Sequence, residues 1–431
     1  MNIDELFQLC TANKSYDKTK AITGGKIRCH VVDPYATYCE FFVSPELKDE
    51  ISEFGRKLIN WGNEVEKNYV ESLQPGLTSK TCFFNEGGVR NSLQDCLNGD
   101  EFIYNPPLFY LDDDLAGKAD LLRKDESHPS NFGDHHYIVE EIKFSKDFHK
   151  YDKSHYLYQG VFYNYLLGLI QGYTPEIFYM VDRMGNRNEF IYSNYESGLM
   201  TILDGIREIK NGNLFPIPEM NKCEKAYWKG YANQKAIEDN NLSLIVDLYH
   251  GAKKNAENNG VRTVSEFAQF KEGDVSNLFK TPKPVRDKFL LANAQAINEN
   301  KNKIINSLPS EFTHYDNYIF MDVEDSGWIH PDLPHYVFLI GVTVFDGSES
   351  YFNSFVALNE NDESQMFDKY FGFSWRQEDV DALESMVLFW DAYENKCDDE
   401  KDERIKKIID YNEDDCNSML YIFDWMNSNL D

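Results

Sequence analysis

The sequence has no long hydrophobic run and no amino-terminal leader pattern. No stretch approaches the 18 apolar residues that a membrane-spanning helix needs. Residues 1–5, MNIDE, lack the basic start and apolar run of a secretory signal. We therefore expect a cytoplasmic protein without a membrane partner.

Basic residues are scarce. The chain has 43 Lys and Arg against 73 Asp and Glu, for a net charge of -30. Because phosphate binding draws on local Lys and Arg, this balance excludes a uniformly basic nucleic-acid-binding surface and predicts a restricted basic track. One such track follows the first motif described below: Lys143, Lys146, Lys150 and Lys153, with His149 and His155 between them.

The eight cysteines include no Cys-x-x-Cys pair. In a cytoplasmic chain of this size they are expected to be reduced thiols, several of them buried. The hydrophobic content of 42% and aromatic content of 15% indicate packed domains. A length of 431 residues suits two or three of them. The changes in pattern along the chain predict an α/β (α+β multidomain) protein with parts at 1–235, 236–308 and 309–431.

The most informative pattern combines two acidic residues and a lysine. Glu141 and Lys143 are two apart on a predicted strand, so their side chains project to the same side. Asp120 lies in residues 119–122, which are predicted to form the neighbouring strand. Two adjacent carboxylates repel unless a cation joins them, and such oxygen ligands suit Mg²⁺ or Mn²⁺. A metal-bound water can attack a phosphodiester, and Lys143 would orient or deprotonate that water.

Gln159 and Tyr163 follow on a predicted helix over residues 155–170. Their spacing of four places them on one helical face, which can reach back over the strands. The set of Asp120, Glu141, Lys143, Gln159 and Tyr163 resembles the PD-(D/E)XK nucleases, in particular the RecB-like branch with its Gln-x-x-x-Tyr motif. This resemblance implies a restriction-endonuclease-like core.

In that family an acidic residue on an early helix completes the metal site. The resemblance implies Glu66 for this role, with Glu64 as the alternative. Ser44 can cap the predicted helix and Pro45 fits its first position, while apolar residues recur at three and four up to Val65.

Many RecB-like nucleases hold an iron–sulfur cluster with one early cysteine and three late ones. Here Cys223 matches the first late ligand, and Cys39 is the early partner. Ala226 and Ala232 stand at the other two late positions, around the retained Trp228. Since a cluster normally needs four ligands, the resemblance predicts that the cluster is absent.

The middle part has a helical, Asn- and Lys-rich pattern. Gly260 separates two predicted short helices, and Thr263 can cap the second, which indicates a helix-hairpin-helix-like unit. Such units contact phosphate through backbone amides at helix N-termini. A spacer without DNA contact is the alternative.

The third part carries another acidic pattern. Asp322 and Glu324 share one face of a predicted strand over residues 318–324, and residues 335–345 supply a second strand. Tyr411 and Asp415 lie on a predicted helix. These residues resemble the first motif and the last, Tyr-x-x-x-Asp, of the ribonuclease-H-like DEDD exonucleases. There, four carboxylates hold two metal ions.

This third domain is shortened relative to that family. Only about two dozen residues separate Val344 from Phe371, too few for the elements that carry the second catalytic aspartate. Asp362, Glu363 and Asp368 are nearby acids, and nothing in the sequence marks one as a replacement.

The order of the three parts resembles a family of RecB-like nucleases that in some members is joined to a helicase. It implies a metal-dependent DNA nuclease, an exonuclease in repair or end processing, acting on single-stranded DNA or DNA ends with a helicase as candidate partner. The first alternative is a catalytically decayed nucleic-acid-binding or scaffold protein. The second is a DEDD-type RNA exonuclease that depends on Asp322 and Asp415.

Overall fold

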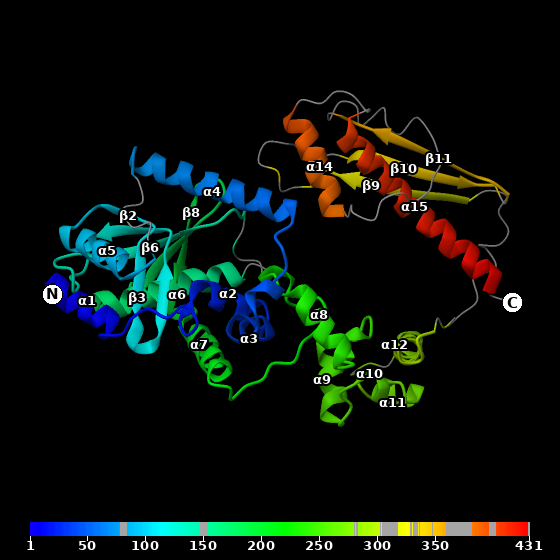
Figure 1. Cartoon of the computed structure of the whole chain (residues 1–431), viewed down its shortest axis with the longest axis horizontal. Coiled ribbons are helices and arrows are strands. Elements are labelled where there is room, and N and C mark those ends of the chain that lie inside the picture. The colour runs from blue at the N-terminus through cyan, green and yellow to red at the C-terminus, as the bar shows by residue number, and fades with distance from the viewer. Residues whose placement is uncertain are drawn as a thin grey trace. The chain divides into compact units, whose positions relative to one another are not determined.

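The computed structural model divides the chain into two compact units. Unit 1 comprises Met1–Glu50 with Leu58–Lys301, and unit 2 comprises Ile51–Lys57 with Asn302–Asp431. Figure 1 shows the elements of both. The structure describes residues 1–77, 84–146, 148, 154–279, 281, 283–301, 303, 318–327, 330, 335, 337–346, 348–358, 382–395 and 402–429. The predicted boundaries at 235 and 308 stay predictions.

A five-stranded sheet forms the centre of unit 1. Strands β6 and β7 are parallel and the other neighbours are antiparallel. A parallel pair needs a crossover connection, and α6 (Ser154–Gln171) supplies it. The predicted helix over residues 155–170 is thus confirmed. In sheet order the strands are β2 (Phe102–Tyr104), β5 (Leu121–Asp125), β6 (His136–Ile142), β7 (Ile177–Val181) and β8 (Arg187–Ile191).

Helices cover the two faces of this sheet, with α6 on one side and α4 (Glu53–Leu73) on the other (Figure 1). On the α6 side, Val139 of β6 belongs to a large apolar core with Phe162 of α6. On the α4 side, Ile142 packs in a smaller cluster with Tyr69 of α4. Because side chains alternate along a strand, consecutive residues of β6 enter different environments.

A small second sheet leads into the first. It has the order β1 (Ile22–Thr23), β4 (Leu115–Lys118) and β3 (Pro107–Tyr110). Asp120 lies in the short link between β4 and β5, so the predicted strand at 119–122 begins only at Leu121. The remaining helices of this region are α1 (Ile3–Thr11), α2 (Gly24–Val32), α3 (Pro34–Phe42), α5 (Glu86–Asn98) and α7 (Glu196–Lys210).

The helix predicted to begin at Pro45 starts later. Pro45–Leu47 forms a single 3-10 turn, η1, and α4 begins at Glu53. Between them, the Asp49 N–H donates to the Tyr227 carbonyl at 2.8 Å. The Asp49 carboxylate also accepts from the Gly230 N–H at 3.0 Å. These tertiary bonds hold the segment outside a helix, which its local pattern did not indicate.

The helical part of unit 1 has its own apolar core. The predicted cap is confirmed, because the Thr263 hydroxyl accepts from the Glu266 N–H at 3.2 Å and Glu266 bonds back to the Thr263 N–H. Gly260 has a φ of +83°, the left-handed conformation that favours glycine. The helices are α8 (Lys229–Glu238), α9 (His250–Asn258), α10 (Val264–Phe267), α11 (Glu272–Ser276) and α12 (Pro284–Glu299).

Unit 2 contains an antiparallel sheet with two helices packed on it. Both predicted strands are confirmed as β9 and β10, and the predicted helix around Tyr411 is part of α15. Phe338 of β10 stacks on Phe389 of α14 with ring centroids 4.1 Å apart. In order the elements are β9 (Tyr318–Asp325), β10 (Val337–Phe345), β11 (Ser350–Val356), α14 (Ala382–Glu394) and α15 (Glu403–Asn429).

Several residues singled out in the sequence lie outside the described residues: His149, Lys150, Lys153, Asp362, Glu363 and Asp368. Among the helices that the structure describes, none combines the length and the apolar character needed to cross a membrane.

Candidate active sites

The structure brings the predicted residues of unit 1 together at the carboxyl end of β6. The Lys143 amine donates to Asp120 Oδ2 at 3.0 Å and to Glu141 Oε1 at 2.5 Å. Backbone bonds fix the two acids, since Asp120 N–H donates to Glu141 Oε2 at 3.3 Å and Ile142 N–H donates to Asp120 Oδ2 at 2.8 Å. We call this cluster the Lys143 centre: Glu66, Asp120, Glu141, Lys143, Gln159 and Tyr163.

The acids and the amine of the Lys143 centre are mostly withdrawn from solvent. The Glu141 side chain is fully buried, and those of Asp120 and Lys143 are 14% and 16% exposed. Burial, and then repulsion by Asp120, raises the pKa of Glu141 to about 8. Burial disfavours the charged amine of Lys143, but the carboxylates of Asp120 and Glu141 outweigh it and raise the pKa of that amine. The two neighbouring acids thus favour the charged form of Lys143.

Glu66 reaches this centre from α4. Its Oε1 accepts from Asn105 Nδ2 at 3.0 Å, and the Asn105 N–H donates to the Asp120 carbonyl at 2.9 Å. Burial, followed by the charge of Asp120, raises the pKa of Glu66. Glu64 is exposed, so the structure brings Glu66 and not Glu64 beside Asp120. Asn105 was not singled out in the sequence.

Gln159 and Tyr163 form a hydrogen bond on α6, with Gln159 Nε2 donating to the Tyr163 hydroxyl at 3.2 Å. Tyr163 is 5% exposed. Burial, and then the charge of Glu141, raises its pKa. Its ring lies against two glycines, and a Cβ at Gly117 would be 2.5 Å from Tyr163 Cε1. A side chain at Gly24 would meet the same tyrosine at its hydroxyl. Tyr163 is therefore a buried packing contact between α6 and these two glycines.

The neighbouring Glu140 has a different environment. Its carboxylate accepts from Arg123 Nε at 2.5 Å, forms an ion pair with Arg187 Nη2 at 2.7 Å and accepts from the Tyr69 hydroxyl at 2.7 Å. Tyr69 lies one turn after Glu66 on α4. Glu140 thus joins three elements on the α4 side of the sheet, while Glu141 faces Lys143.

Unit 2 contains a second acidic group, which we call the carboxylate cluster: Asp322, Glu324 and Asp415. Ligand oxygens of the three lie within 4.8 Å of one another. Among the described residues it is the one group of three or more His, Cys, Asp or Glu side chains close enough to share a metal ion. Burial, and then Asp322, raises the pKa of Glu324 to about 8. Burial is also the main cause of the raised pKa of Asp322.

Two polar residues that the sequence analysis did not single out donate hydrogen bonds to the carboxylate cluster. Asn412 Nδ2 donates to Asp322 Oδ2 at 2.8 Å, and Ser385 Oγ donates to Glu324 Oε2 at 3.2 Å. Gly341 pairs with Asp322 in the sheet, and a Cβ there would overlap the Asn412 side chain. Tyr411 hydrogen-bonds Asp415, as the Tyr-x-x-x-Asp spacing suggests, and burial followed by this bond raises the pKa of Tyr411.

The four positions considered for an iron–sulfur cluster lie in one buried apolar cluster. Cys39 and Cys223 are free thiols that pack there with Ala226 and Ala232. Burial raises the pKa of Cys39 to about 12 and also raises that of Cys223. The tryptophan of the motif packs in the same cluster and its Nε1 donates to Glu40 Oε1 at 2.8 Å.

Comparison with known proteins bears on the carboxyl-terminal part. Residues 367–427 match the family model of the RNase_H superfamily. No curated protein matches the chain. The matched segment includes Tyr411 and Asp415, so it supports the ribonuclease-H-like resemblance at this end of the chain. It indicates nuclease-type phosphodiester hydrolysis and a nucleic-acid substrate. Nucleases of this kind use divalent metals, and the carboxylate cluster could bind one.

Proposed function

We propose that this protein is a metal-dependent deoxyribonuclease that hydrolyses phosphodiester bonds at the Lys143 centre. One observation carries the proposal: buried carboxylates from two different segments, Asp120 and Glu141, contact the single amine of Lys143. Glu66, from a third segment, lies beside Asp120. The three acids outnumber the one lysine, and the excess negative charge is what a bound cation would balance.

The donor atoms are of the kind that Mg²⁺ and Mn²⁺ bind, although those of Asp120, Glu141 and Glu66 do not all lie within 4.8 Å of one another in the described structure. Asp120, Glu141 and Glu66 offer carboxylate oxygens, the ligands that such ions prefer. The raised pKa values of Glu141 and Glu66 reflect carboxylates that are buried near another negative charge. One lysine balances only part of that charge, and a divalent cation would balance the rest. When bound, the ion would supply an activated water and neutralise charge on the phosphate.

The residues of the centre would have separate tasks. Lys143 would hold the attacking water by one of its three N–H groups while its other two remain on Asp120 and Glu141. Gln159 would support the site through its bond to Tyr163, whose ring fixes α6 against Gly117. Glu66 would complete the metal ligands.

The choice of DNA rests on the resemblance to RecB-like nucleases. It supports action on single-stranded DNA or DNA ends, in repair or end processing, with exonucleolytic cleavage and a helicase as partner. The net charge of -30 predicts weak nonspecific binding to nucleic acid.

The carboxylate cluster favours a second candidate function, an RNA exonuclease of the DEDD type run from unit 2. Its support is the approach of Asp322, Glu324 and Asp415 to within 4.8 Å, together with the match of residues 367–427. This activity would require Asp322 and would not require Lys143.

One experiment separates these functions. The purified protein is given Mn²⁺ with end-labelled linear and circular single-stranded DNA, and in parallel with labelled RNA. Asp120→Asn and Asp322→Asn are matched variants, because each removes one carboxylate charge without changing shape. Loss of DNA cleavage in Asp120→Asn but not in Asp322→Asn supports the proposal. The opposite pattern, or loss of RNA cleavage alone in Asp322→Asn, supports the second candidate. No cleavage by the parent protein contradicts both and favours a binding or scaffold role.

A further inference from the structure

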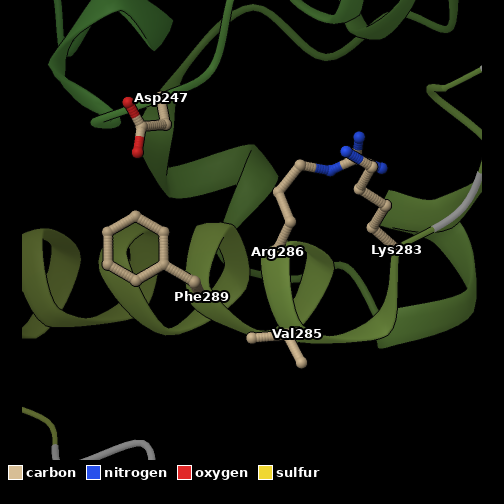
Figure 2. Close-up of a pocket in the computed structure, with 5 residues that line it drawn as sticks. All are labelled: Asp247, Lys283, Val285, Arg286 and Phe289. Atoms are coloured by element: carbon tan, nitrogen blue, oxygen red, sulfur yellow. The ribbon is translucent and has the colours of Figure 1, made fainter.

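A cavity in the helical part of unit 1 combines an aromatic ring with charges of both signs. Its volume is about 440 Å³, and it is a shallow depression that is widely open to solvent. Five residues line it: Asp247, Lys283, Val285, Arg286 and Phe289. In Figure 2, Asp247 and Phe289 are on one side of the view, and Lys283 and the guanidinium of Arg286 are on the other.

Bonds between described residues hold both ends of this cavity in place. The Val246 N–H donates to Asn293 Oδ1 at 2.9 Å, which fixes the segment before Asp247 against α12 one turn beyond Phe289. Arg286 donates twice to Asp287 Oδ1, at 3.0 and 2.7 Å, and its guanidinium lies 3.3 Å from the ring centroid of Phe279. The guanidinium of Arg286 is therefore held in place by Asp287 and Phe279 at the side of the cavity.

Two side chains of the cavity are left to contact a ligand. Asp247 and Lys283 are exposed, and neither the Asp247 carboxylate nor the Lys283 amine has a hydrogen bond or ion pair in the part of the chain that the structure describes. Asp247 has a φ of +60°, in the left-handed region. Val285 is an apolar side chain that is 75% exposed at the rim. An acid, an aromatic ring and a cation thus all line the cavity.

We propose that this cavity binds one unpaired nucleotide of a nucleic-acid strand. The base would stack on Phe289, its donor groups would face Asp247, and its phosphate would lie at Lys283. Aromatic stacking and a basic contact to the backbone are how proteins hold single strands, whose bases expose both faces and edges. The inference rests on the proposed function and names its substrate as single-stranded.

The carboxylate also predicts which base is preferred. Guanine offers two adjacent donors on its Watson–Crick edge, N1–H and the amino group, and a carboxylate can accept both. Adenine and cytosine each offer one amino group beside a ring acceptor. Thymine offers one N–H between two carbonyls, which repel a carboxylate. We therefore expect guanine to bind best and thymine worst.

The test measures binding without cleavage, by fluorescence anisotropy in EDTA. The probes are oligothymidylates of about ten nucleotides, a length that one binding module can cover, either unchanged or with one central dG. The parent protein should bind the dG strand more tightly, and Asp247→Ala should abolish that preference. Phe289→Leu should lower the affinity for both strands about tenfold. Lys283→Glu should lower the affinity for both strands. It should also reduce the slope of log affinity against log salt concentration by about 1, the value for one phosphate contact.

Lys254→Glu is the matched control, since Lys254 is an exposed lysine of α9 outside the cavity. It should change affinity less than Lys283→Glu does. Equal affinity of the parent for the two strands would overturn the base contact, and an unchanged affinity in Lys283→Glu would overturn the phosphate contact. Because binding is read in EDTA, a protein that shows these effects but never cleaves would support the cavity and contradict the nuclease proposal.

Discussion

The ring of Tyr163 occupies the space that any side chain at Gly117 would need. A Cβ on Gly117 would lie 2.5 Å from Tyr163 Cε1 and 3.0 Å from Cδ1, well inside van der Waals contact. Gly117 precedes Asp120 by three residues, so the glycine sets how closely the link bearing Asp120 approaches α6. Glycine is thus required at position 117, three residues before Asp120, for a steric reason.

Gly117→Ala is expected to displace Tyr163 and with it Gln159 and the centre. Overpacking of this kind costs about 1 to 3 kcal/mol, so we expect a folded protein with lower melting temperature and strongly reduced cleavage. Thermal unfolding and the DNA cleavage assay measure the two effects.

A matched pair of glycines on α2 provides the control. Gly24→Ala would meet the Tyr163 hydroxyl, whereas a Cβ at the adjacent Gly25 meets only Thr23 Oγ1 at an ordinary 3.6 Å. Gly24→Ala should resemble Gly117→Ala, and Gly25→Ala should resemble the parent. Equal effects of the two α2 variants would mean that Tyr163 is not the sensitive contact.

Substitutions of Glu140 and Glu141 are expected to have different effects, the first on stability and the second on cleavage. Glu140→Ala would leave Arg123 and Arg187 without their shared carboxylate and cost about 3 kcal/mol of unfolding free energy. Glu141→Gln should abolish cleavage with a smaller change in stability. Urea unfolding of both variants, beside the cleavage assay, checks this; a stable Glu140→Ala protein would contradict the assigned role of the arginine contacts.

The raised pKa of Glu141 predicts how stability changes with pH. An acid whose pKa is raised on folding stabilises the folded state fully below its unfolded pKa, and this contribution is lost as pH rises through the folded pKa. For Glu141 the values are 4.5 and about 8. In EDTA, the melting temperature of the parent should therefore fall more between about pH 5 and pH 8 than that of Glu141→Gln.

Mn²⁺ should reverse this trend. Because a ligand carboxylate must lose its proton to bind the ion, stabilisation by Mn²⁺ should increase over the same pH range. Glu141→Gln should respond less at every pH. A parent protein whose Mn²⁺-induced shift in melting temperature is independent of pH would count against Glu141 as a ligand.

Substitutions in the buried cluster around Trp228 are predicted to create an iron–sulfur site. The parent protein should contain no iron–sulfur cluster, because only Cys39 and Cys223 remain at the four positions. The double variant Ala226→Cys with Ala232→Cys should take up iron and sulfide after anaerobic reconstitution, since all four positions lie in one buried cluster. Iron content and visible absorbance measure it. A matched pair of Ala→Ser substitutions should bind no iron.

Local patterns predicted much of the fold where local forces dominate. The apolar recurrence of residues 155–170 and the reciprocal bonds of Thr263 and Glu266 act within a few residues, and both are as predicted. The start of α4 is set instead by Asp49 bonding to Tyr227 and Gly230, which are distant in sequence. No local pattern contains that information.

In the candidate sites too, residues within sequence motifs could be predicted, and residues that act only through distant contacts could not. Motif order led to Asp120, Glu141 and Lys143, and the structure brings their side chains together, although their roles stay predictions. Asn105, Ser385 and Asn412 could not be found in this way, because each is a common polar residue that becomes important only through the acid it contacts.

The adjacency of Glu140 and Glu141 has a consequence for folding errors. A strand that slips by one residue exchanges its two faces. A slip in β6 that brought Glu141 to the position of Glu140, beside Arg123 and Arg187, would bring Ile142 to the position of Glu141. The opposite slip would bring Val139 to the position of Glu140. The contacts of Glu140 with the two arginines and of Glu141 with the Asp120 N–H can therefore form together only in the correct alignment of β6, so these two acids also select its register.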